Sequence, residues 1–401
     1  IYTIMKKDYD LIIYGATGFT GSLVVKYLDN NYHDISWAIA GRNEEKLKKI
    51  SNSTSYKPKY FIADSEDIAG LNNIASQTNV IASLAGPFNR YSDKLVDSCV
   101  KNSTHYVDIT GENIWVRDLI DRHHEEAVKK GIKIIPSCGY DSIPSDMGCF
   151  YLHRSLGENL LSVDGYHRGG GGVSGGTIES AFTMKNYKTN YSIGHPFLLN
   201  SKDFIGKQNR DANKDTFKIK YIDSIQSWSA PFVMSIANTR VVRRSAELHE
   251  LNQSGYGSDF IYKEFMNVKK YSSALMVSIG LAVLGLMIVS PISSLFRKLF
   301  TKPGNGPDKK TRDNGWFESI FVGKNTNNET YKLRMYGDGD PGYKTTAKFI
   351  CESALCLVKS DGNLENTNSG GVLTTSTGLG DHLIERLKKA DILFEGPEKI
   401  V

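Results

Sequence analysis

LIIYGATGFTG, at residues 11–21, is the stretch of sequence that decides the fold. Its apolar start predicts a buried strand that ends at Gly15, and the residues from 22 onward have helical spacing. Gly15 permits a tight turn, Gly18 lets backbone N–H groups approach a phosphate, and Gly21 lets the helix pack close to the strand. The G-x-x-G-x-x-G pattern in this position predicts a dinucleotide-binding turn; the alternative is an ordinary glycine-rich loop.

Strand-like and helix-like segments alternate over the first 150 residues. After the first strand, further strand-like runs lie at residues 37–40, 59–63, 80–85, 106–109 and 133–136, with helical patterns between them. Such alternation is typical of a parallel sheet with right-handed crossovers. We therefore expect an α/β protein whose residues 8–150 form a Rossmann-type, doubly wound parallel sheet that binds NAD(P).

The pattern changes after residue 150. Alternating apolar and polar residues, as at 217–222, indicate a half-exposed antiparallel sheet. We expect a second α/β domain over residues 151–380, with a mostly antiparallel sheet and substrate contacts. A C-terminal helix and tail are expected at 381–401.

Residues 271–296 contain no charged residue, and Lys and Arg flank them on both sides. A segment of this length and composition can span a bilayer, dip into or lie on a lipid surface, or form a buried core helix. We favour attachment to a lipid surface, because a span would place two halves of one enzyme on opposite sides of the membrane.

The composition excludes several classes of protein. The chain has 401 residues, a net charge of +5 and 40% hydrophobic residues, which argues against a disordered chain and against a nucleic-acid-binding protein. Its five cysteines include no C-x-x-C pair, so we expect neither a zinc site nor a disulfide framework. The polar first ten residues predict no signal peptide and hence an intracellular protein.

The second predicted strand is followed by Arg42 instead of the acidic residue that holds an NAD ribose. An arginine can pair with a 2′-phosphate, so we expect NADP rather than NAD, although a plain surface charge remains the alternative. Asp64 could accept from the adenine amino group or cap a helix. The loop at Ala85-Gly86-Pro87 could shape a wall for the nicotinamide or simply end a strand. The expected cofactor-binding residues are Gly15, Ala16, Thr17, Gly18, Phe19, Thr20, Gly21, Arg42, Asp64, Ala85, Gly86 and Pro87.

SCGYDSIPSD, at residues 137–146, places acid, hydroxyl and thiol groups after the sixth strand. Tyr140 or Asp141 could move a proton during reduction, and these two are our expected catalytic residues. Cys138 could be a nucleophile, but the sequence places no histidine beside it. The alternative is a structural turn in which Ser145 or Asp146 caps the next helix.

Several further motifs lie along nearly the whole chain. They are AGR (40–42), SLAGPF (83–88), YVDITGE (106–112), PSCGYDSIPSD (136–146), GGTIES (175–180), KPGNGP (302–307), GDGDPGY (337–343) and GGVLTTSTGLG (370–380). Together with the glycine-rich turn they resemble the saccharopine dehydrogenase-like oxidoreductase family, and they are similar to the mycobacterial trans-acting enoyl reductases. The resemblance implies a Rossmann domain, a second α/β domain and NAD(P)-linked redox chemistry.

The resemblance also implies a lipid-related function. The bacterial members reduce double bonds in long lipid precursors, and animal-type members are associated with lipid droplets and membranes. We expect an NADP-dependent oxidoreductase of a small, lipid-like substrate at a membrane or lipid-droplet surface, in lipid or glycolipid metabolism. A mitochondrial or other membrane location and a homodimer are compatible with this expectation. The alternatives are a non-catalytic NADP-binding interaction protein at the same surface and a saccharopine-type reductase.

Overall fold

The computed structural model describes residues 7–171, 182, 187–290, 306–360 and 362–400. One of its two sheets, sheet A, is seven-stranded and parallel, with the order β13-β6-β5-β4-β1-β2-β3. The strands are β1 (Tyr9–Tyr14), β2 (Trp37–Gly41), β3 (Tyr60–Ile62), β4 (Thr78–Ser83), β5 (His105–Asp108), β6 (Lys133–Ile135) and β13 (Gly371–Val372). The predicted parallel sheet is confirmed, and β1 ends at Tyr14 as expected.

Helices join the strands of sheet A and cover it. They are α1 (Phe19–Asn31), α2 (Glu44–Ser53), α3 (Ile68–Ser76), α4 (Phe88–Tyr91), α5 (Asp93–Lys101), α6 (Asn113–Lys130) and α7 (Ile143–Leu156). Residues 11–14 of β1 are all buried, with alternate side chains in hydrophobic clusters on opposite faces of the sheet. A strand covered on both faces needs the continuous apolar run that the sequence shows.

Sheet B is the second seven-stranded sheet, with the order β14-β12-β11-β7-β10-β9-β8. Its strands are β7 (Leu160–Gly170), β8 (Lys220–Ile222), β9 (Ser227–Pro231), β10 (Ile261–Val268), β11 (Trp316–Asn325), β12 (Thr330–Asp338) and β14 (Leu393–Ile400). Among these, β7 and β10 pair in parallel and the other neighbours are antiparallel. The expectation of a mostly antiparallel second sheet is thus confirmed.

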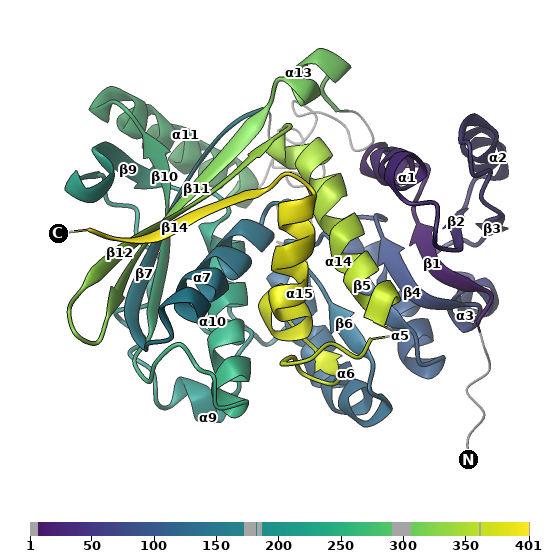
Figure 1. Cartoon of the computed structure of the whole chain (residues 1–401), viewed down its shortest axis with the longest axis horizontal. Helices are drawn as coiled ribbons and strands as arrows, with labels where there is room; N and C mark the ends of the chain where they lie inside the picture. The colour runs from purple at the N-terminus through teal and green to yellow at the C-terminus, as the bar shows by residue number, and fades with distance from the viewer. Residues whose placement is uncertain (1–6, 172–181, 183–186, 291–305, 361, 401) are drawn as a thin grey trace.

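The remaining elements lie between the strands of sheet B or connect the two sheets. They are α9 (Lys202–Ile205), η1 (Asp223–Ile225), α10 (Ser235–Leu251), α11 (Tyr271–Val289), α13 (Lys309–Asp313), η2 (Pro341–Thr345), α14 (Thr346–Ser360) and α15 (Thr375–Lys389). Figure 1 shows α14 and α15 running between the sheet A half on the right and the sheet B half on the left.

The chain returns to sheet A after building most of sheet B. Strand β13 pairs in parallel with β6, where Gly371 is opposite Lys133. Helix α14 packs on α1, and the buried Glu352 accepts hydrogen bonds from Tyr27 Oη at 2.7 Å and Tyr32 Oη at 2.6 Å. Residues that the sequence analysis assigns to the second domain therefore also complete the first sheet.

Helix α11 accounts for most of the uncharged segment, and it lies on the outside of the protein. Its only buried residue is Ala274, and it packs against β9 through its first turns. The core-helix alternative is therefore wrong for residues 271–289. Residues 291–296 of the segment lie outside the described residues.

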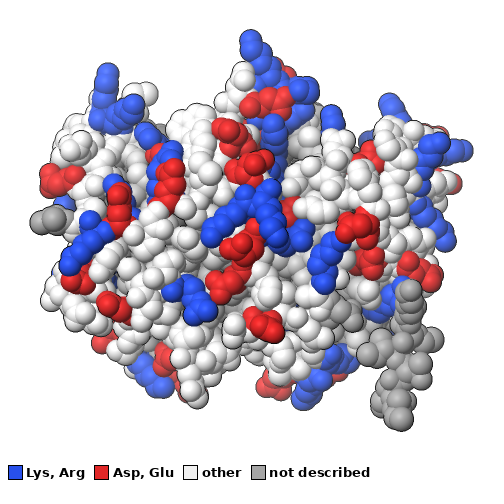
Figure 2. Space-filling view, viewed as in Figure 1, with Lys and Arg blue, Asp and Glu red and all other residues white. Residues whose placement is uncertain are grey.

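The charged side chains carry both signs over the described face in Figure 2. Blue Lys and Arg side chains lie next to red Asp and Glu side chains across the middle of this face. Three ion pairs connect β12 with its neighbours: Arg334 pairs with Glu318 and Glu395, and Lys332 pairs with Glu398. Positive charge on this face is thus largely balanced by neighbouring carboxylates.

Candidate cofactor and catalytic site

The turn between β1 and α1 has the geometry that the glycine pattern predicts. Gly15 has a φ of +82°, and a Cβ there would lie 2.9 Å from Ala85 N. A Cβ on Gly21 would lie 2.3 Å from Gly15 O, so α1 can approach the strand only with glycine at this position. Gly18 is the N-cap of α1 and has no side chain to cover the N–H groups of the first helical turn. These backbone groups and the helix dipole make an anion site at the carboxyl end of β1.

The residues expected near the adenosine lie at the ends of the next two strands. Arg42 follows β2 and is exposed, and Asp64 follows β3 and is also exposed. Burial raises the pKa of Tyr14 to about 12; the Asp64 carboxylate adds to the rise and the Arg42 guanidinium opposes it. Both charges therefore lie near the end of β1, where the adenosine half of a dinucleotide binds in this fold.

Asp64 does not cap a helix. Its carboxylate accepts a hydrogen bond from Glu66 N at 3.1 Å in the turn after β3. The cap of α3 is Asp67, which accepts from Gly70 N at 2.9 Å. The helix-cap alternative for Asp64 is wrong because the helix begins four residues later, and its role as an adenine contact stays a prediction.

Ala85, Gly86 and Pro87 form the loop that leads from β4 into α4. Ala85 and Gly86 are at least partly accessible, whereas Pro87 is buried. Glu112 fixes the end of this loop: its buried carboxylate accepts hydrogen bonds from Phe88 N at 3.0 Å and Asn89 N at 2.9 Å. Glu112 lies within the YVDITGE motif, but its role could not be predicted from the sequence. It orders the loop that we expect to face the nicotinamide.

Tyr140 and Asp141 lie between the two sheets, on the loop from β6 to α7. The Tyr140 ring packs edge-to-face on Phe317 of β11 at a centroid distance of 5.3 Å, and Tyr140 N donates to Thr346 Oγ1 at 3.1 Å. Burial, Asp141 and Glu264 raise the pKa of Tyr140, so the phenol is protonated at neutral pH. Burial raises the pKa of Asp141 to about 6. A phenol donor thus adjoins a carboxyl that can exchange protons near neutrality.

Cys138 is not placed to act as a nucleophile. The residue is completely buried, its thiol points to Ile135 O at 3.2 Å, and burial raises its pKa well above the ordinary value. A reactive cysteine needs an accessible thiolate. The nucleophile hypothesis is therefore wrong, and Cys138 is a core residue.

Asp146 caps a helix, but not the helix predicted from the sequence. Its carboxylate accepts hydrogen bonds from Ser376 N at 2.7 Å and Thr375 Oγ1 at 2.6 Å, at the N-terminus of α15, and from Ser245 Oγ of α10 at 2.5 Å. The N-cap of its own helix α7 is Ser142, which makes no side-chain cap bond. The predicted cap of α7 by Ser145 or Asp146 is wrong, because tertiary contacts bring α15 to the carboxylate.

A row of buried polar side chains, which the sequence analysis missed, borders Tyr140. Glu264 of β10 accepts hydrogen bonds from Tyr262 Oη at 2.8 Å and Asn238 Nδ2 at 3.0 Å. His167 of β7 lies with Nε2 3.6 Å from Glu264 Oε1, and its Nδ1 is 2.9 Å from Ser319 Oγ. The sequence signal that could have identified this row is Glu264 itself. It occupies an inward-facing position of a strand with alternating polarity, where an apolar residue is normal.

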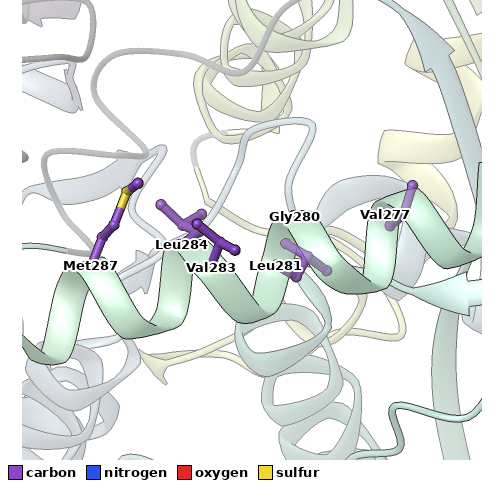
Figure 3. A pocket seen from close by; sticks show the side chains of 6 residues that line it. All are labelled: Val277, Gly280, Leu281, Val283, Leu284 and Met287. Atoms are coloured by element: carbon purple, nitrogen blue, oxygen red, sulfur yellow. The ribbon is translucent and has the colours of Figure 1, made fainter.

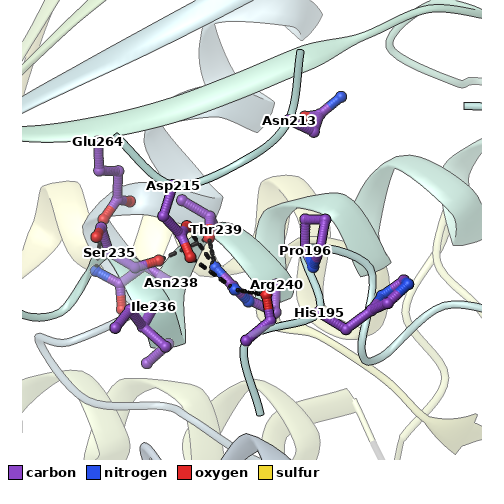
Figure 4. Close-up of polar contacts among 12 residues, drawn as sticks. His195, Pro196, Asn213, Asp215, Ser235, Ile236, Asn238, Thr239, Arg240 and Glu264 are labelled. Carbon is purple, nitrogen blue, oxygen red and sulfur yellow. Dashed lines mark hydrogen bonds and ion pairs between the residues drawn. The ribbon is translucent and has the colours of Figure 1, made fainter. Parts of the chain in front are cut away.

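Helix α10 is fixed beside this row by an ion pair and by hydrogen bonds from buried arginines. Figure 4 shows Arg240 reaching Asp215, with Asn238 and Glu264 nearby. The two Arg240–Asp215 hydrogen bonds measure 2.6 and 2.8 Å, and Arg240 is fully buried. Arg243, one turn on, donates to Pro196 O and Tyr262 O. These contacts hold Asn238 in place.

Within the described residues no group of three or more His, Cys, Asp or Glu could hold a metal ion.

Comparisons with known proteins agree with this geometry. Residues 11–135 match the family described as the saccharopine dehydrogenase NADP binding domain. A protein of Mycobacterium tuberculosis named as a trans-acting enoyl reductase is 31% identical over 98% of both chains. The chain belongs to the saccharopine dehydrogenase-like oxidoreductases.

Other members of the family and one solved structure match over the same length. The trans-acting enoyl reductase of Mycobacterium ulcerans is 28% identical over 97% of both chains. The apo saccharopine dehydrogenase (L-Glu forming) of Saccharomyces cerevisiae covers 98% of this chain and 100% of its own, with 16% identity and a TM-score of 0.54. That structure shows the shared fold, because the identity is low.

The residues present fit the NADP that the family binds. The glycine turn offers a pyrophosphate an open helix N-terminus, and Arg42 is exposed at the end of β2 for a 2′-phosphate. The protein is an NAD(P)-dependent oxidoreductase with NADP as its cofactor. The individual contacts of the twelve predicted cofactor-binding residues, and the catalytic roles of Tyr140 and Asp141, remain predictions.

Proposed function

We propose that this oxidoreductase uses NADPH to reduce a carbon–carbon double bond of a lipid-like substrate at the surface of a lipid droplet or another intracellular membrane. The observation that carries the proposal is α11, a 19-residue helix with high mean hydropathy and one buried residue. By length and composition α11 could cross a membrane. Its exposure needs a cause, because large apolar patches on soluble proteins are rare and mark binding surfaces.

The outward face of α11 is strongly apolar. Met276 is 73% exposed, Leu286 is 68% exposed and Ile279 is 55% exposed. Figure 3 shows further apolar side chains along the same helix, Val277, Leu281, Val283, Leu284 and Met287, with Gly280 between them. Burial of such side chains in lipid contributes about 1.5–3 kcal/mol each, so a few of them suffice for attachment.

The topology of sheet B favours attachment over a single span. Two residues, Lys269 and Lys270, separate β10 from α11, and β11 follows α11 in the chain. Strand β10 pairs with β7 in parallel and β11 pairs with it antiparallel, so the end of β10 and the start of β11 lie at the same end of sheet B and hence on the same side of any membrane. A span would require residues 291–305 to cross back, yet this stretch is short and contains Arg297, Lys298 and Lys302.

The start of α11 has the side chains that favour a membrane interface. The Trp228 ring lies 5.0 Å from the Tyr271 ring, centroid to centroid, and 5.3 Å from the Tyr221 ring. Lys269 and Lys270 are exposed immediately before the helix. Aromatic rings prefer the headgroup level, and each lysine adds about 1 kcal/mol near an anionic surface.

The chemistry follows from the groups around Tyr140. When bound, NADPH supplies a hydride for the reduced bond. Reduction of a double bond also needs a proton, which the neutral phenol of Tyr140 can donate. Asp141, with a pKa raised to about 6, is the adjacent group that can exchange protons with solvent. Relatives named as enoyl reductases support a double bond as the reduced group.

Flotation on a density gradient with lipid droplets or vesicles tests the location. We expect replacement of Met276, Ile279 and Leu286 by Ser to move the protein from the floating to the soluble fraction while NADPH binding persists. The matched control is Leu251→Ser on α10, since Leu251 is 72% exposed but outside α11. A triple variant that is folded and floats like the parent would refute attachment through α11. A parent protein that does not float would refute the lipid-surface location.

A further inference from the structure

A segment from the later part of the chain closes over the glycine turn. Gly306 lies so close to Phe19 that a Cβ on it would be 2.4 Å from Phe19 Cε1. The Tyr343 ring packs edge-to-face on Phe19 with centroids 4.8 Å apart. The Arg312 guanidinium carbon is 5.2 Å from the centroid of the same ring. Three groups that follow α11 in sequence therefore pack on the first residue of α1, next to its N-cap Gly18.

The structure fixes this segment in place. Arg312 donates from Nη1 to Pro307 O, and its own carbonyl accepts from Asp340 N at 2.9 Å. Asp340 is buried and accepts from Tyr343 N at 3.0 Å and Lys344 N at 3.1 Å. Arg312 is thus presented from ordered backbone. In Figure 1 the segment around α13 lies between sheet B and α1.

Among the described residues Arg312 has no close carboxylate partner: Asp308 and Asp340 act on its charge, but neither forms an ion pair with it. Asp313, its neighbour, forms ion pairs with Lys309 and Lys344 instead. In the part of the chain that the structure describes, no carboxylate forms an ion pair with Arg312. The glycine turn itself, residues 15–21, contains no lysine or arginine, although a bound pyrophosphate carries negative charge.

We propose that Arg312 is a cofactor-binding residue that pairs with the pyrophosphate of NADP at the N-terminus of α1. The guanidinium lies over the side chain that adjoins the anion-binding N–H groups, within the reach of a flexible arginine. The guanidinium supplies one full positive charge, whereas the dipole of α1 supplies about half a positive charge at the N-terminus of the helix. The later part of the chain thereby contributes directly to cofactor binding, and the bound cofactor strengthens its contact with α1.

The experiment compares NADPH and NADH, which share the pyrophosphate but differ in the 2′-phosphate. R312M keeps an apolar stem on Phe19 and removes the charge. We expect its Kd for both cofactors, from fluorescence titration, to rise about tenfold and by the same factor, since one charge-assisted hydrogen-bond pair is lost. The dependence of Kd on salt should also weaken. The matched control is K310M, an exposed basic residue of the same helix, which should leave both Kd values unchanged.

Three results would overturn the assignment. They are unchanged affinity in R312M, loss confined to NADPH, and weaker binding with the parental salt dependence, which would indicate a packing role alone. If R312M does not fold, R312K is tested in its place, because lysine keeps the positive charge but lacks the planar guanidinium group that can form two parallel hydrogen bonds. We expect R312K to weaken both cofactors about threefold with the salt dependence kept. Parental affinity in that variant would contradict the proposal.

Discussion

Replacement of Gly21 by Ala tests the dinucleotide turn at the point where the structure leaves least room. The new Cβ would lie 2.3 Å from Gly15 O and 2.9 Å from Ala16 Cα, both backbone atoms that cannot rotate away. An ordinary contact needs about 3.4 Å or more, so α1 must move outward by about 1 Å. Overpacking of this kind costs roughly 1–3 kcal/mol, and it also displaces the N–H groups that face the pyrophosphate.

We expect G21A to lower the free energy of unfolding in urea by that amount and to raise the Kd for NADPH at least tenfold. The matched control is G280A, the same change on α11, where an added Cβ meets no described atom within 4 Å outside the backbone of its own helix. This control should keep parental NADPH binding and equal or slightly greater stability, because alanine favours a helix. Parental stability and affinity in G21A would refute the close approach of α1 to the turn.

Three further predictions concern charged side chains. R42A should weaken NADPH binding about tenfold, through loss of roughly 1.5–3 kcal/mol, and leave NADH binding unchanged; equal loss in fluorescence titrations would contradict the 2′-phosphate role. Burial raises the pKa of Asp141 to about 6, above its unfolded value near 3.9, so the folded state binds more protons and the free energy of unfolding falls as pH rises from about 4 to about 6. D141N should flatten this slope and be the more stable protein at pH 7 in urea titrations; an unaltered slope would show that Asp141 is not the group responsible. D146A should leave the buried donors Thr375 Oγ1 and Ser376 N without an acceptor and cost at least about 3 kcal/mol in thermal or urea unfolding. S245A should cost less, because it removes one donor and leaves the carboxylate bonded to α15; near-parental stability of D146A would refute this bridging role.

The sequence was sufficient for the elements whose signals are local. The buried run that ends at Gly15 and the glycine spacing predicted β1, the turn and α1, because strand burial and the backbone approach are encoded within eleven consecutive residues. The exposed apolar helix was also predicted, since a long stretch without charge needs no tertiary information. NADP was predicted from one residue, Arg42, at the position that normally holds an acid.

Contacts between distant segments could not be predicted in the same way. Strand β13 has only two residues, and its pairing with β6 depends on the packing of α14 and α15. Asp146 resembled a local helix cap, but its donors stand about 100 and 230 residues further along the chain. Glu264 and His167 come from neighbouring strands of sheet B, and only the fold brings them beside Asn238.

The central claim, that this protein transfers hydride from NADPH to a lipid, is tested most directly by isotope transfer. The purified protein is incubated with NADPH deuterated at the transferable position and with lipids extracted from its own cells, and the lipids are analysed by mass spectrometry. We predict a lipid product that is two mass units heavier than its precursor when ordinary NADPH is used and three units heavier when the deuterated NADPH is used. We expect Y140F to form neither product. NADPH binding without deuterium in any lipid would contradict this account and favour a non-catalytic, cofactor-binding protein.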